Sequence, residues 1–388
     1  MVVNPSFPRI LTAPKSSFFL FGARGVGKST WARETFPEAH RFDLLDEGLF
    51  QSFLADPALF GAELRTLAPE SWVVVDEVQR IPGLLNEVHR AIEELRLRFA
   101  LLGSSARKLK TAGTNLLAGR ALWRTMYPFV PQELGAAFDL ENTLRFGSIP
   151  LVVAAEDRAE TLAAYVQLYL REEIRGEALV RNLPGFVRFL PIAALAHGQV
   201  VNVSSIARDA GTARTTVQGY LEILEDTLLA WRLPAFESRL RVRERKHPKL
   251  YWIDPGLVRA VKKQQSGPVP SEEAGPLFEG WIHTLLRAYG QSAGLFDEIA
   301  YWAPAEAQSV EVDFLLQRSG EHLALEVKSG QRFTPGWLSG LQAIGDLPRL
   351  ARRILVYTGD RELRTPEGIE VWPLAKLLGA LAEGTLWP

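Results

Sequence analysis

The sequence predicts an α/β protein built on a parallel sheet, followed by further units of mixed helix and strand. Short apolar runs that end in polar or acidic residues alternate with segments of helical spacing, and a glycine-rich loop follows the first of these runs. Hydrophobic residues make up 47% of the 388 residues, as in ordinary globular proteins. Since right-handed crossovers place helices on both faces of a parallel sheet, we expect a covered sheet.

The expected elements follow in chain order. The apolar runs predict four strands, at residues 18–21, 41–46, 72–77 and 99–102. An amphipathic stretch at 156–175 predicts a helical subdomain, residues 186–236 a helical unit that ends in a strand pair, and residues 249–388 a return to mixed strand and helix. At about 100–200 residues per domain the length predicts two to four units. We expect the boundaries to fall at 1–135, 136–180, 181–247 and 248–388.

Composition excludes several classes of protein. Lys and Arg number 44 and Asp and Glu 45, so the formal net charge of −1 gives no basic field over the whole molecule, and any nucleic-acid contact needs a local patch. Zero cysteines exclude disulfides, thiolate zinc sites and cysteine nucleophiles. The N-terminal residues lack the pattern of a signal peptide, and no apolar run reaches the roughly 20 residues that span a bilayer. We therefore expect a cytoplasmic protein with no membrane partner.

A phosphate-binding loop is the strongest local pattern. Residues 22–29, GARGVGKS, satisfy G-x-x-x-x-G-K-[ST] between an apolar run and a helical segment. Glycines let successive N–H groups point at the phosphates of ATP, and the following helix adds its positive N-terminal end. Lys28 is expected to reach the β- and γ-phosphates. The residues expected to hold ATP and Mg²⁺ are Gly22, Gly25, Val26, Gly27, Lys28, Ser29, Thr30 and Asp76, with Ser29 and Asp76 as metal ligands.

An acidic pair ends the third expected strand, where ligands bind in open α/β sheets. Asp76 is expected to hold the Mg²⁺ shell, and Glu77 to orient or deprotonate the water that attacks the γ-phosphate. The fourth strand ends at Ser104 and Ser105, which the sequence does not distinguish; we assign the role of γ-phosphate sensor to Ser104. Arg120 is either a finger that reaches a neighbouring subunit's nucleotide or an ordinary surface arginine.

The order of these motifs resembles that of the AAA+ ATPases. The runs LLGSS at 101–105, LAGR at 117–120, YPF at 127–129 and KLYWIDPGL at 249–257 are similar to prokaryotic ATP-binding proteins in which an AAA+ module is joined to a C-terminal domain of undefined function. This resemblance covers nearly the whole chain. It implies a P-loop AAA+ sheet with a helical lid, a homo-oligomeric ring such as a hexamer, and a further arginine sensor in the lid, for which Arg171 and Arg175 are available.

Residues 203–221 predict a helix, a tight turn and a second helix, as in helix-turn-helix proteins. Arg214, Thr215 and Gln218 would project from the second helix toward DNA. The strand pair expected afterwards makes this a winged helix, and a basic run follows, consisting of Arg239, Arg241, Arg243, Arg245, Lys246 and Lys249. Arg241 and Arg243 are expected on a basic wing that neutralises DNA phosphates. A spacer or protein-contact module, and a solvated basic edge strand, remain as alternatives.

Acidic residues near the C-terminus form a second chemical pattern. Residues 311–316 and 323–328 predict a hairpin that places Asp313, Glu326 and Lys328 together. The two carboxylates could hold one divalent cation, Lys328 could polarise an attacking water, and Glu279 on a preceding helix could complete the cluster. The set resembles the restriction-endonuclease-like nuclease superfamily, which implies an α/β domain of that fold. An inactive domain with a salt-bridged network is the alternative.

These patterns lead to one main hypothesis and two others. The main one is an AAA+ ATPase that uses ATP and Mg²⁺ to rearrange an attached winged helix and nuclease-like domain on DNA. The second is a nucleotide-dependent switch whose C-terminal domain binds nucleic acid or protein without cutting it. The third is a protein-remodelling chaperone whose basic run is a solvated face.

Overall fold

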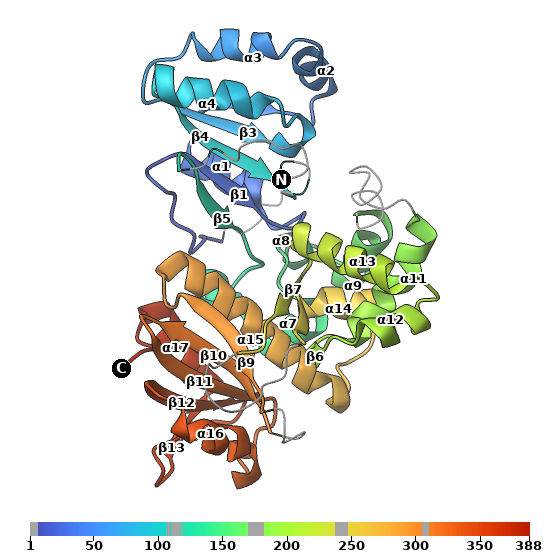
Figure 1. Cartoon of the computed structure of the whole chain (residues 1–388), viewed down its shortest axis with the longest axis vertical. Coiled ribbons are helices and arrows are strands. Elements are labelled where there is room, and N and C mark those ends of the chain that lie inside the picture. The colour runs from blue at the N-terminus through green and yellow to red at the C-terminus, as the bar shows by residue number, and fades with distance from the viewer. Residues whose placement is uncertain are drawn as a thin grey trace.

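Three β-sheets organise the part of the chain that the computed structural model describes (Figure 1). The described residues are 7–105, 119–169, 182–236, 247–304 and 310–388, together with 107, 109 and 117.

The first sheet is entirely parallel, with the strand order β2-β3-β4-β1-β5. Its strands are β1 (Phe18–Phe21), β2 (His40–Asp43), β3 (Trp72–Asp76), β4 (Arg98–Gly103) and β5 (Leu122–Thr125). The four runs predicted from the sequence are therefore strands of a parallel sheet. The fifth strand, β5, was not predicted, because Leu122 and Trp123 are exposed and no long apolar run marks this edge.

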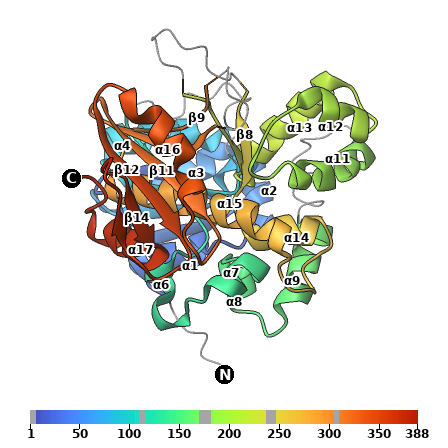
Figure 2. The ribbon, with the colours of Figure 1, turned by 90° about the horizontal axis from the view of Figure 1, so that it is seen from below.

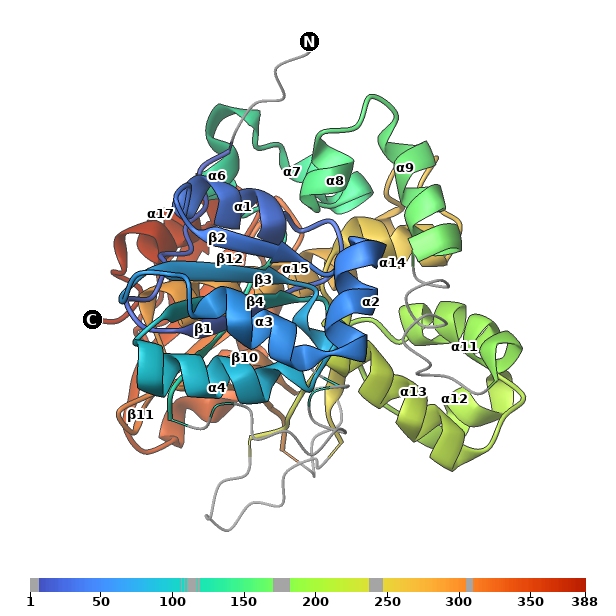
Figure 3. The ribbon, with the colours of Figure 1, turned by 90° about the horizontal axis from the view of Figure 1, so that it is seen from above.

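Helices cover both faces of this sheet, as Figure 3 shows with α1 on one side and α3 and α4 on the other. These helices are α1 (Lys28–Thr35), α2 (Glu47–Ala55), α3 (Pro57–Leu64) and α4 (Leu84–Leu95). Side chains alternate between the faces along each strand: Phe18 and Leu20 pack in the core that contains α1, whereas Phe19 and Phe21 pack in the core beneath α2, α3 and α4. The sheet is thus buried on both sides.

Short helices follow the first sheet. They are α6 (Pro131–Leu134), α7 (Leu140–Phe146), α8 (Pro150–Val153) and α9 (Arg158–Ala164), and a π-helical turn follows at Tyr165–Tyr169. Asp139 caps α7 by accepting from the Asn142 N–H, and Asp157 caps α9 by accepting from the Glu160 N–H. The expected helical subdomain therefore consists of several short helices, of which the described part ends at residue 169.

The middle unit joins three helices to a small antiparallel sheet. Its elements are α11 (Leu183–Leu195), α12 (Val203–Asp209), α13 (Arg214–Asp226), β6 (Gln199–Val200), β7 (Ala230–Leu233) and β8 (Lys249–Trp252), with strand order β6-β8-β7. We expected residue 248 to start the C-terminal unit. Because β8 is the central strand of this sheet, the middle unit extends through Trp252.

The C-terminal domain has a mixed six-stranded sheet in the order β13-β14-β12-β11-β10-β9. Its strands are β9 (Glu298–Trp302), β10 (Val312–Arg318), β11 (Glu321–Lys328), β12 (Leu350–Tyr357), β13 (Leu363–Arg364) and β14 (Glu370–Pro373). Its helices are α15 (Ser271–Ala293), α16 (Ser339–Ala343) and α17 (Leu374–Glu383), and α14 (Pro255–Val261) precedes them. The hairpin predicted at 311–328 is β10 paired antiparallel with β11.

One continuous hydrophobic core joins these units. It runs from Phe18 and Leu20 in the first sheet, through the middle unit and Trp281 of α15, to Phe314 and Val356 in the C-terminal sheet. Figure 2 shows α15 lying between the C-terminal sheet and the helices α11, α12 and α13. Among the residues described, no helix combines the length and apolar character needed to cross a lipid bilayer.

Candidate functional site

The phosphate-binding loop connects β1 to α1. Gly25 and Gly27 take φ values of 80° and 90°, a left-handed region that glycine adopts without steric cost. A side chain at Gly22 would place its Cβ 2.7 Å from the Met126 carbonyl oxygen, so this position also requires glycine. The Lys28 ammonium donates to the Gly22 carbonyl oxygen at 2.7 Å, which holds it across the mouth of the loop.

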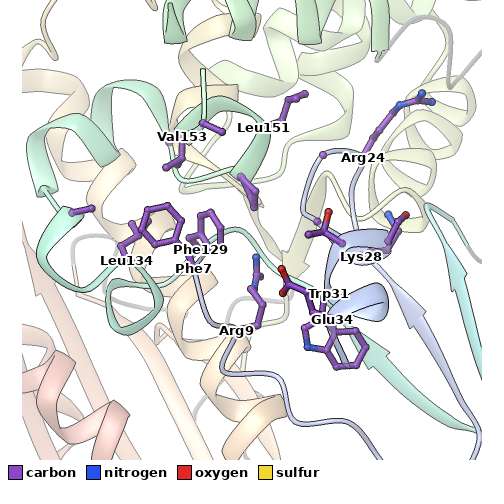
Figure 4. Close-up of a pocket in the computed structure, with 18 of the residues that line it drawn as sticks. Phe7, Arg9, Arg24, Lys28, Trp31, Glu34, Phe129, Leu134, Leu151 and Val153 are labelled. Carbon is purple, nitrogen blue, oxygen red and sulfur yellow. The ribbon is translucent and has the colours of Figure 1, made fainter. Parts of the chain in front are cut away.

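A cavity of about 790 Å³ opens beside this loop (Figure 4). Five of the eight residues expected to hold ATP and Mg²⁺ line it: Gly25, Gly27, Lys28, Ser29 and Thr30. Gly22 and Val26 shape the loop from behind, and Val26 is fully buried. The cavity is large enough for a nucleotide, since small-molecule pockets have volumes of about 300–1,000 Å³.

Aromatic side chains lie on the far side of the cavity from Lys28 (Figure 4). The rings of Phe7 and Phe129 meet edge to face, with centroids 5.2 Å apart. The Arg9 guanidinium stacks over Phe129 at 4.7 Å and donates to the Val26 carbonyl oxygen at 3.2 Å, which ties this apolar wall to the phosphate loop. The cavity therefore has a cationic end and an aromatic end, as a nucleotide with phosphates and a flat base requires.

The acidic pair lies at the carboxyl end of β3. Glu77 lines the cavity, and its φ of 55° places it in the left-handed region, which costs a non-glycine residue about 1–3 kcal/mol. Asp76, the last residue of β3, accepts from the Glu77 N–H at 3.0 Å. Ser29 lines the cavity together with Glu77, whereas Asp76 does not line it. The hydroxyl of Ser29 and the carboxylate of Asp76 are hard oxygen donors of the type that Mg²⁺ prefers, so the donor types fit that ion.

A residue that the sequence analysis missed connects Glu77 to the end of β4. The Gln79 side-chain amide donates both to the Glu77 carboxylate and to the Ser104 hydroxyl, the latter at 3.1 Å. Gln79 is only 1% exposed and packs against Gly103, where a Cβ would lie 2.5 Å from the side-chain amide oxygen of Gln79, Oε1. Ser105 instead accepts from the Arg107 N–H at 3.1 Å. The geometry thus distinguishes the two serines and associates Ser104 with Glu77.

The short helices after the sheet contact the phosphate loop directly. The Leu151 N–H of α8 donates to the Gly25 carbonyl oxygen at 3.2 Å, and the Tyr165 hydroxyl donates to the Arg24 carbonyl oxygen at 2.9 Å. Gly147, Leu151 and Arg158 also line the cavity. These helices therefore cover one side of the cavity. Arg171 and Arg175, the expected sensor arginines, lie outside the described residues.

Arg120 does not line the cavity of its own chain. Its guanidinium forms an ion pair with Glu93 on α4, and its side chain is 37% exposed. Arg120 precedes β5, whose first residue pairs with Phe18 at the start of β1. Arg120 therefore lies near the amino ends of these strands, whereas the phosphate loop follows the carboxyl end of β1. Any contact between Arg120 and a nucleotide would need a second subunit.

The helix pair α12–α13 lies on the outside of the middle unit. Asn202 caps α12 by accepting from the Ser205 N–H at 3.0 Å. At the start of α13, Arg214, Thr215 and Gln218 are exposed, whereas Val217 is fully buried. The three side chains are therefore accessible to a partner. Arg241 and Arg243, expected on the basic wing, fall outside the described residues.

The expected acidic residues of the C-terminal domain lie together, but a lysine lies among them. The Lys249 ammonium of β8 is 3.1 Å from Glu279, 3.2 Å from Glu311 and 3.6 Å from Asp313. Lys249 belongs to the basic run, which was expected either to contact DNA or to lie on an exposed face. Lys249 itself is instead buried, at 2% exposure, and faces carboxylates of α15 and β10.

Glu326 and Lys328 complete this group. The Lys328 ammonium donates to Glu326 at 2.5 Å, and Asp313 accepts from the Val327 N–H at 2.8 Å. Burial, reinforced by the charge of Asp313, raises the pKa of Glu279 to about 7 and the pKa of Glu326 well above its usual range. Burial alone would lower the pKa of Lys249, but its carboxylate neighbours outweigh this effect and raise it. Lys249 is therefore charged.

The carboxylates do not have the geometry of a metal site. Among the described residues, no group of three or more His, Asp or Glu side chains is arranged to hold a metal ion. The predicted ligands Glu279, Asp313 and Glu326 share a neighbourhood, but two of them face Lys249. A divalent cation does not fit this arrangement of side chains.

Comparison with known proteins divides the chain into three parts, the second of which combines the short helices after the first sheet with the middle unit and α14. Residues 14–135 match the family model of an AAA domain, and residues 137–267 and 274–377 match two models described as domains of unknown function, DUF8612 and DUF4143. An uncharacterized protein of Mycobacterium tuberculosis is 27% identical over 369 residues, which cover 92% of this chain and 80% of that protein. An uncharacterized protein of Haemophilus influenzae is 22% identical over 274 residues, 66% of this chain and 65% of that protein.

Solved structures give only distant similarities. The ORC1 protein of Aeropyrum pernix in complex with DNA has a TM-score of 0.25 and 14% identity, over 66% of this chain and 87% of that one. A Signal Transduction ATPase with Numerous Domains from Pyrococcus horikoshii has a TM-score of 0.23 and 13% identity, over 74% and 48%. TM-scores this low do not establish a shared overall fold with either protein. The domain match, the loop and the parallel sheet together show that the chain carries an AAA-type, nucleotide-binding ATPase domain at its N-terminus and a DUF4143 domain at its C-terminus.

Proposed function

We propose that this chain hydrolyses ATP with Mg²⁺ and uses the nucleotide cycle to reposition a DNA-binding middle unit. The proposal is supported above all by an ion pair between the N-terminal ATPase domain and the middle unit. The Arg107 guanidinium, three residues after Ser104, lies 2.7 Å from the carboxylate of Asp226, the last residue of α13. A movement at the end of β4 when the γ-phosphate leaves would thus be transmitted to α13, whose first turn carries the exposed residues Arg214 and Thr215.

The loop residues have separate roles in this proposal. Lys28 would bind the β- and γ-phosphates, and Ser29 and Asp76 would hold Mg²⁺, which neutralises phosphate charge when bound. Glu77 would accept a proton from the attacking water, held in place by Gln79. Phe7 and Phe129 would contact the base.

The hydrolysis is tested by phosphate release. Lys28→Ala should abolish release because the phosphates lose their cationic partner, whereas Lys15→Ala, an exposed lysine outside the cavity, should leave the rate unchanged. Glu77→Gln should retain ATP without hydrolysing it. Phosphate release that survives Lys28→Ala would disprove ATP hydrolysis at this loop.

DNA binding by α13 is tested by fluorescence anisotropy with labelled duplex. The affinity should fall steeply with salt, because phosphate contacts release counterions. Arg214→Ala should weaken binding, and Arg364→Ala, an exposed arginine on β13, should not. Equal affinities for the two variants would exclude α13 as the DNA contact.

Assembly into a ring is tested by mixing inactive chains. If Arg120 acts on a neighbour's nucleotide, Arg120→Ala chains and Lys28→Ala chains should each be inactive alone. Mixed subunits should recover part of the activity, because an intact phosphate loop then meets an intact Arg120. No recovery in mixtures that still co-assemble would argue against a finger at Arg120.

Metal-dependent cleavage of nucleic acid is a second candidate function. The proximity of Glu279, Asp313, Glu326 and Lys328 supports it only for a state in which the Lys249 ammonium has left the first two carboxylates. Cleavage that depends on Mg²⁺ or Mn²⁺ and disappears in both Asp313→Ala and Lys328→Ala would support it. Cleavage that is unchanged in both variants would come from another site or a contaminant.

A further inference from the structure

The acidic group of the C-terminal domain contains a cation supplied by another unit. Glu279, Glu311 and Asp313 belong to the α15 and β10 region, whereas Lys249 begins β8, the central strand of the middle unit's sheet. Its ammonium lies within 3.1–3.6 Å of an oxygen of each of these three carboxylates. This is the position, relative to the carboxylates, that a bound cation would take.

The backbone holds Lys249 in this position. Lys249 pairs with Val200 of β6 on one side and with Leu233 of β7 on the other, so its backbone is fixed within the sheet. The ammonium can therefore leave the carboxylates in two ways, by a change of side-chain conformation or by a shift of the whole sheet. The Tyr251 hydroxyl, two residues along the same face of β8, donates to Glu279. Both side chains therefore dock β8 onto the same carboxylate.

The lysines do not satisfy the whole group. Glu279, Glu311, Asp313 and Glu326 provide four carboxylates, and within the described part of the chain two lysines, Lys249 and Lys328, are paired with them. The Glu326 side chain is only 5% exposed, and one of its oxygens, Oε2, is buried and has no hydrogen-bond partner among the described residues. Because Lys328 contacts the other oxygen of Glu326, Oε1, the Oε2 atom keeps an acceptor position that no described residue uses.

We propose that Lys249 is a built-in cation that closes this carboxylate group to metal, and that withdrawing its side chain opens a site for one hard divalent cation. Glu279, Asp313 and Glu326 would be the ligands of that ion. Metal binding and docking of β8 are then mutually exclusive, because Lys249 and the ion need the same oxygens. The middle unit thereby controls whether the C-terminal domain holds a metal. This inference goes beyond the proposed ATPase function and does not depend on it.

Electron paramagnetic resonance of free Mn²⁺, titrated with nucleotide-free full-length chain, tests the proposal. Every chain carries Asp76→Asn, so that the N-terminal site does not contribute. The unaltered cluster should bind no Mn²⁺ tightly. Lys249→Met should gain one site per chain, and Lys249→Met combined with Glu326→Gln should lose it. Lys262→Met removes a partly buried lysine that pairs with Glu273 outside the cluster, and should gain nothing.

Thermal unfolding provides a second measurement. Mn²⁺ should raise the melting temperature of Lys249→Met and leave that of the unaltered cluster unchanged, since only a ligand that binds the folded state stabilises it. Lys249→Gln, which keeps a polar side chain, serves if Lys249→Met does not fold. A folded Lys249 variant that binds no Mn²⁺ would overturn the proposal. So would tight binding by the unaltered cluster that Glu326→Gln removes, because the site would then be open already.

Discussion

Replacing Gln79 with methionine should slow ATP hydrolysis without weakening ATP binding. Gln79 donates to the Glu77 carboxylate and to the Ser104 hydroxyl, and it does not line the cavity. Methionine has nearly the same length and no amide, so Gln79→Met removes both hydrogen bonds and fills most of the same space. The change therefore isolates the orientation of Glu77 from the packing of the site.

The size of the effect follows from the bond to Glu77. A hydrogen bond to an ionised group contributes about 1.5–3 kcal/mol, and a neutral one about 1 kcal/mol. If the bond to Glu77 acts mainly in the transition state, kcat should fall about 10- to 100-fold, since each 1.4 kcal/mol corresponds to about tenfold. KM for ATP should stay within about twofold, because Gln79 touches no part of the cavity.

Steady-state phosphate release and equilibrium binding of a non-hydrolysable ATP analogue measure the two effects separately. Gln51→Met is the matched control, because Gln51 also donates to a glutamate, Glu47 at 2.7 Å, but on the exposed surface of α2. The control should keep full activity. A Gln79→Met enzyme with kcat within twofold of the wild type, or one that loses analogue binding as much as turnover, would refute the proposed link between Gln79 and Glu77.

Three further predictions concern the connections between units. Arg107→Met should uncouple DNA affinity from the bound nucleotide while phosphate release changes less than about threefold, and Asp226→Asn should have the same effect; anisotropy that still responds to ATP in both would contradict the coupling. Gly256→Ala should lower the free energy of unfolding, measured by urea denaturation, by about 2–3 kcal/mol, because the new Cβ would lie 2.1 Å from the carbonyl group of Phe146 at the end of α7. Gly219→Ala in α13 is the control: no atom lies within 4 Å of the new Cβ, so this change should be neutral or slightly stabilising. Burial raises the pKa of Asp254 to about 6, so the folded state binds this proton more tightly than the unfolded state. Relative to Asp254→Asn, the wild type should therefore lose about 1 kcal/mol of its free energy of unfolding between about pH 5 and about pH 7.5. A difference in free energy of unfolding between the two proteins that does not change with pH would refute this.

The phosphate loop and the strands beside it could be predicted because their signals are local. Residues 22–29 are contiguous, and β1, β3 and β4 are apolar runs that are buried on both faces. The edge strand β5 carries no such run, and its place is determined by pairing with β1. The acidic hairpin β10–β11 was also predicted, since its polar residues follow the alternation of a strand.

Residues whose role depends on packing between distant segments could not be predicted. Gln79 is an uncharged residue in a short turn, and its importance arises only because β4 lies beside β3 and brings Ser104 within 3.1 Å. Lys249 ends a run of basic residues, and composition alone assigns it to that run. Its actual partners, Glu279 and Asp313, are 30 and 64 positions away in the sequence.

The same stretch of chain connects the nucleotide cavity to the carboxylate group of the C-terminal domain. One residue, Ile253, separates β8 from Asp254, whose buried carboxylate accepts from the Ser148 N–H at 2.7 Å. Gly147, next to Ser148, lines the nucleotide cavity, and a Cβ there would collide with Asp254. Because these contacts are close and buried, the helices over the cavity cannot shift without moving Asp254 or breaking its hydrogen bond. Since Lys249 lies only five residues before Asp254, a movement of those helices on ATP binding would act directly on the strand that holds Lys249 among the carboxylates.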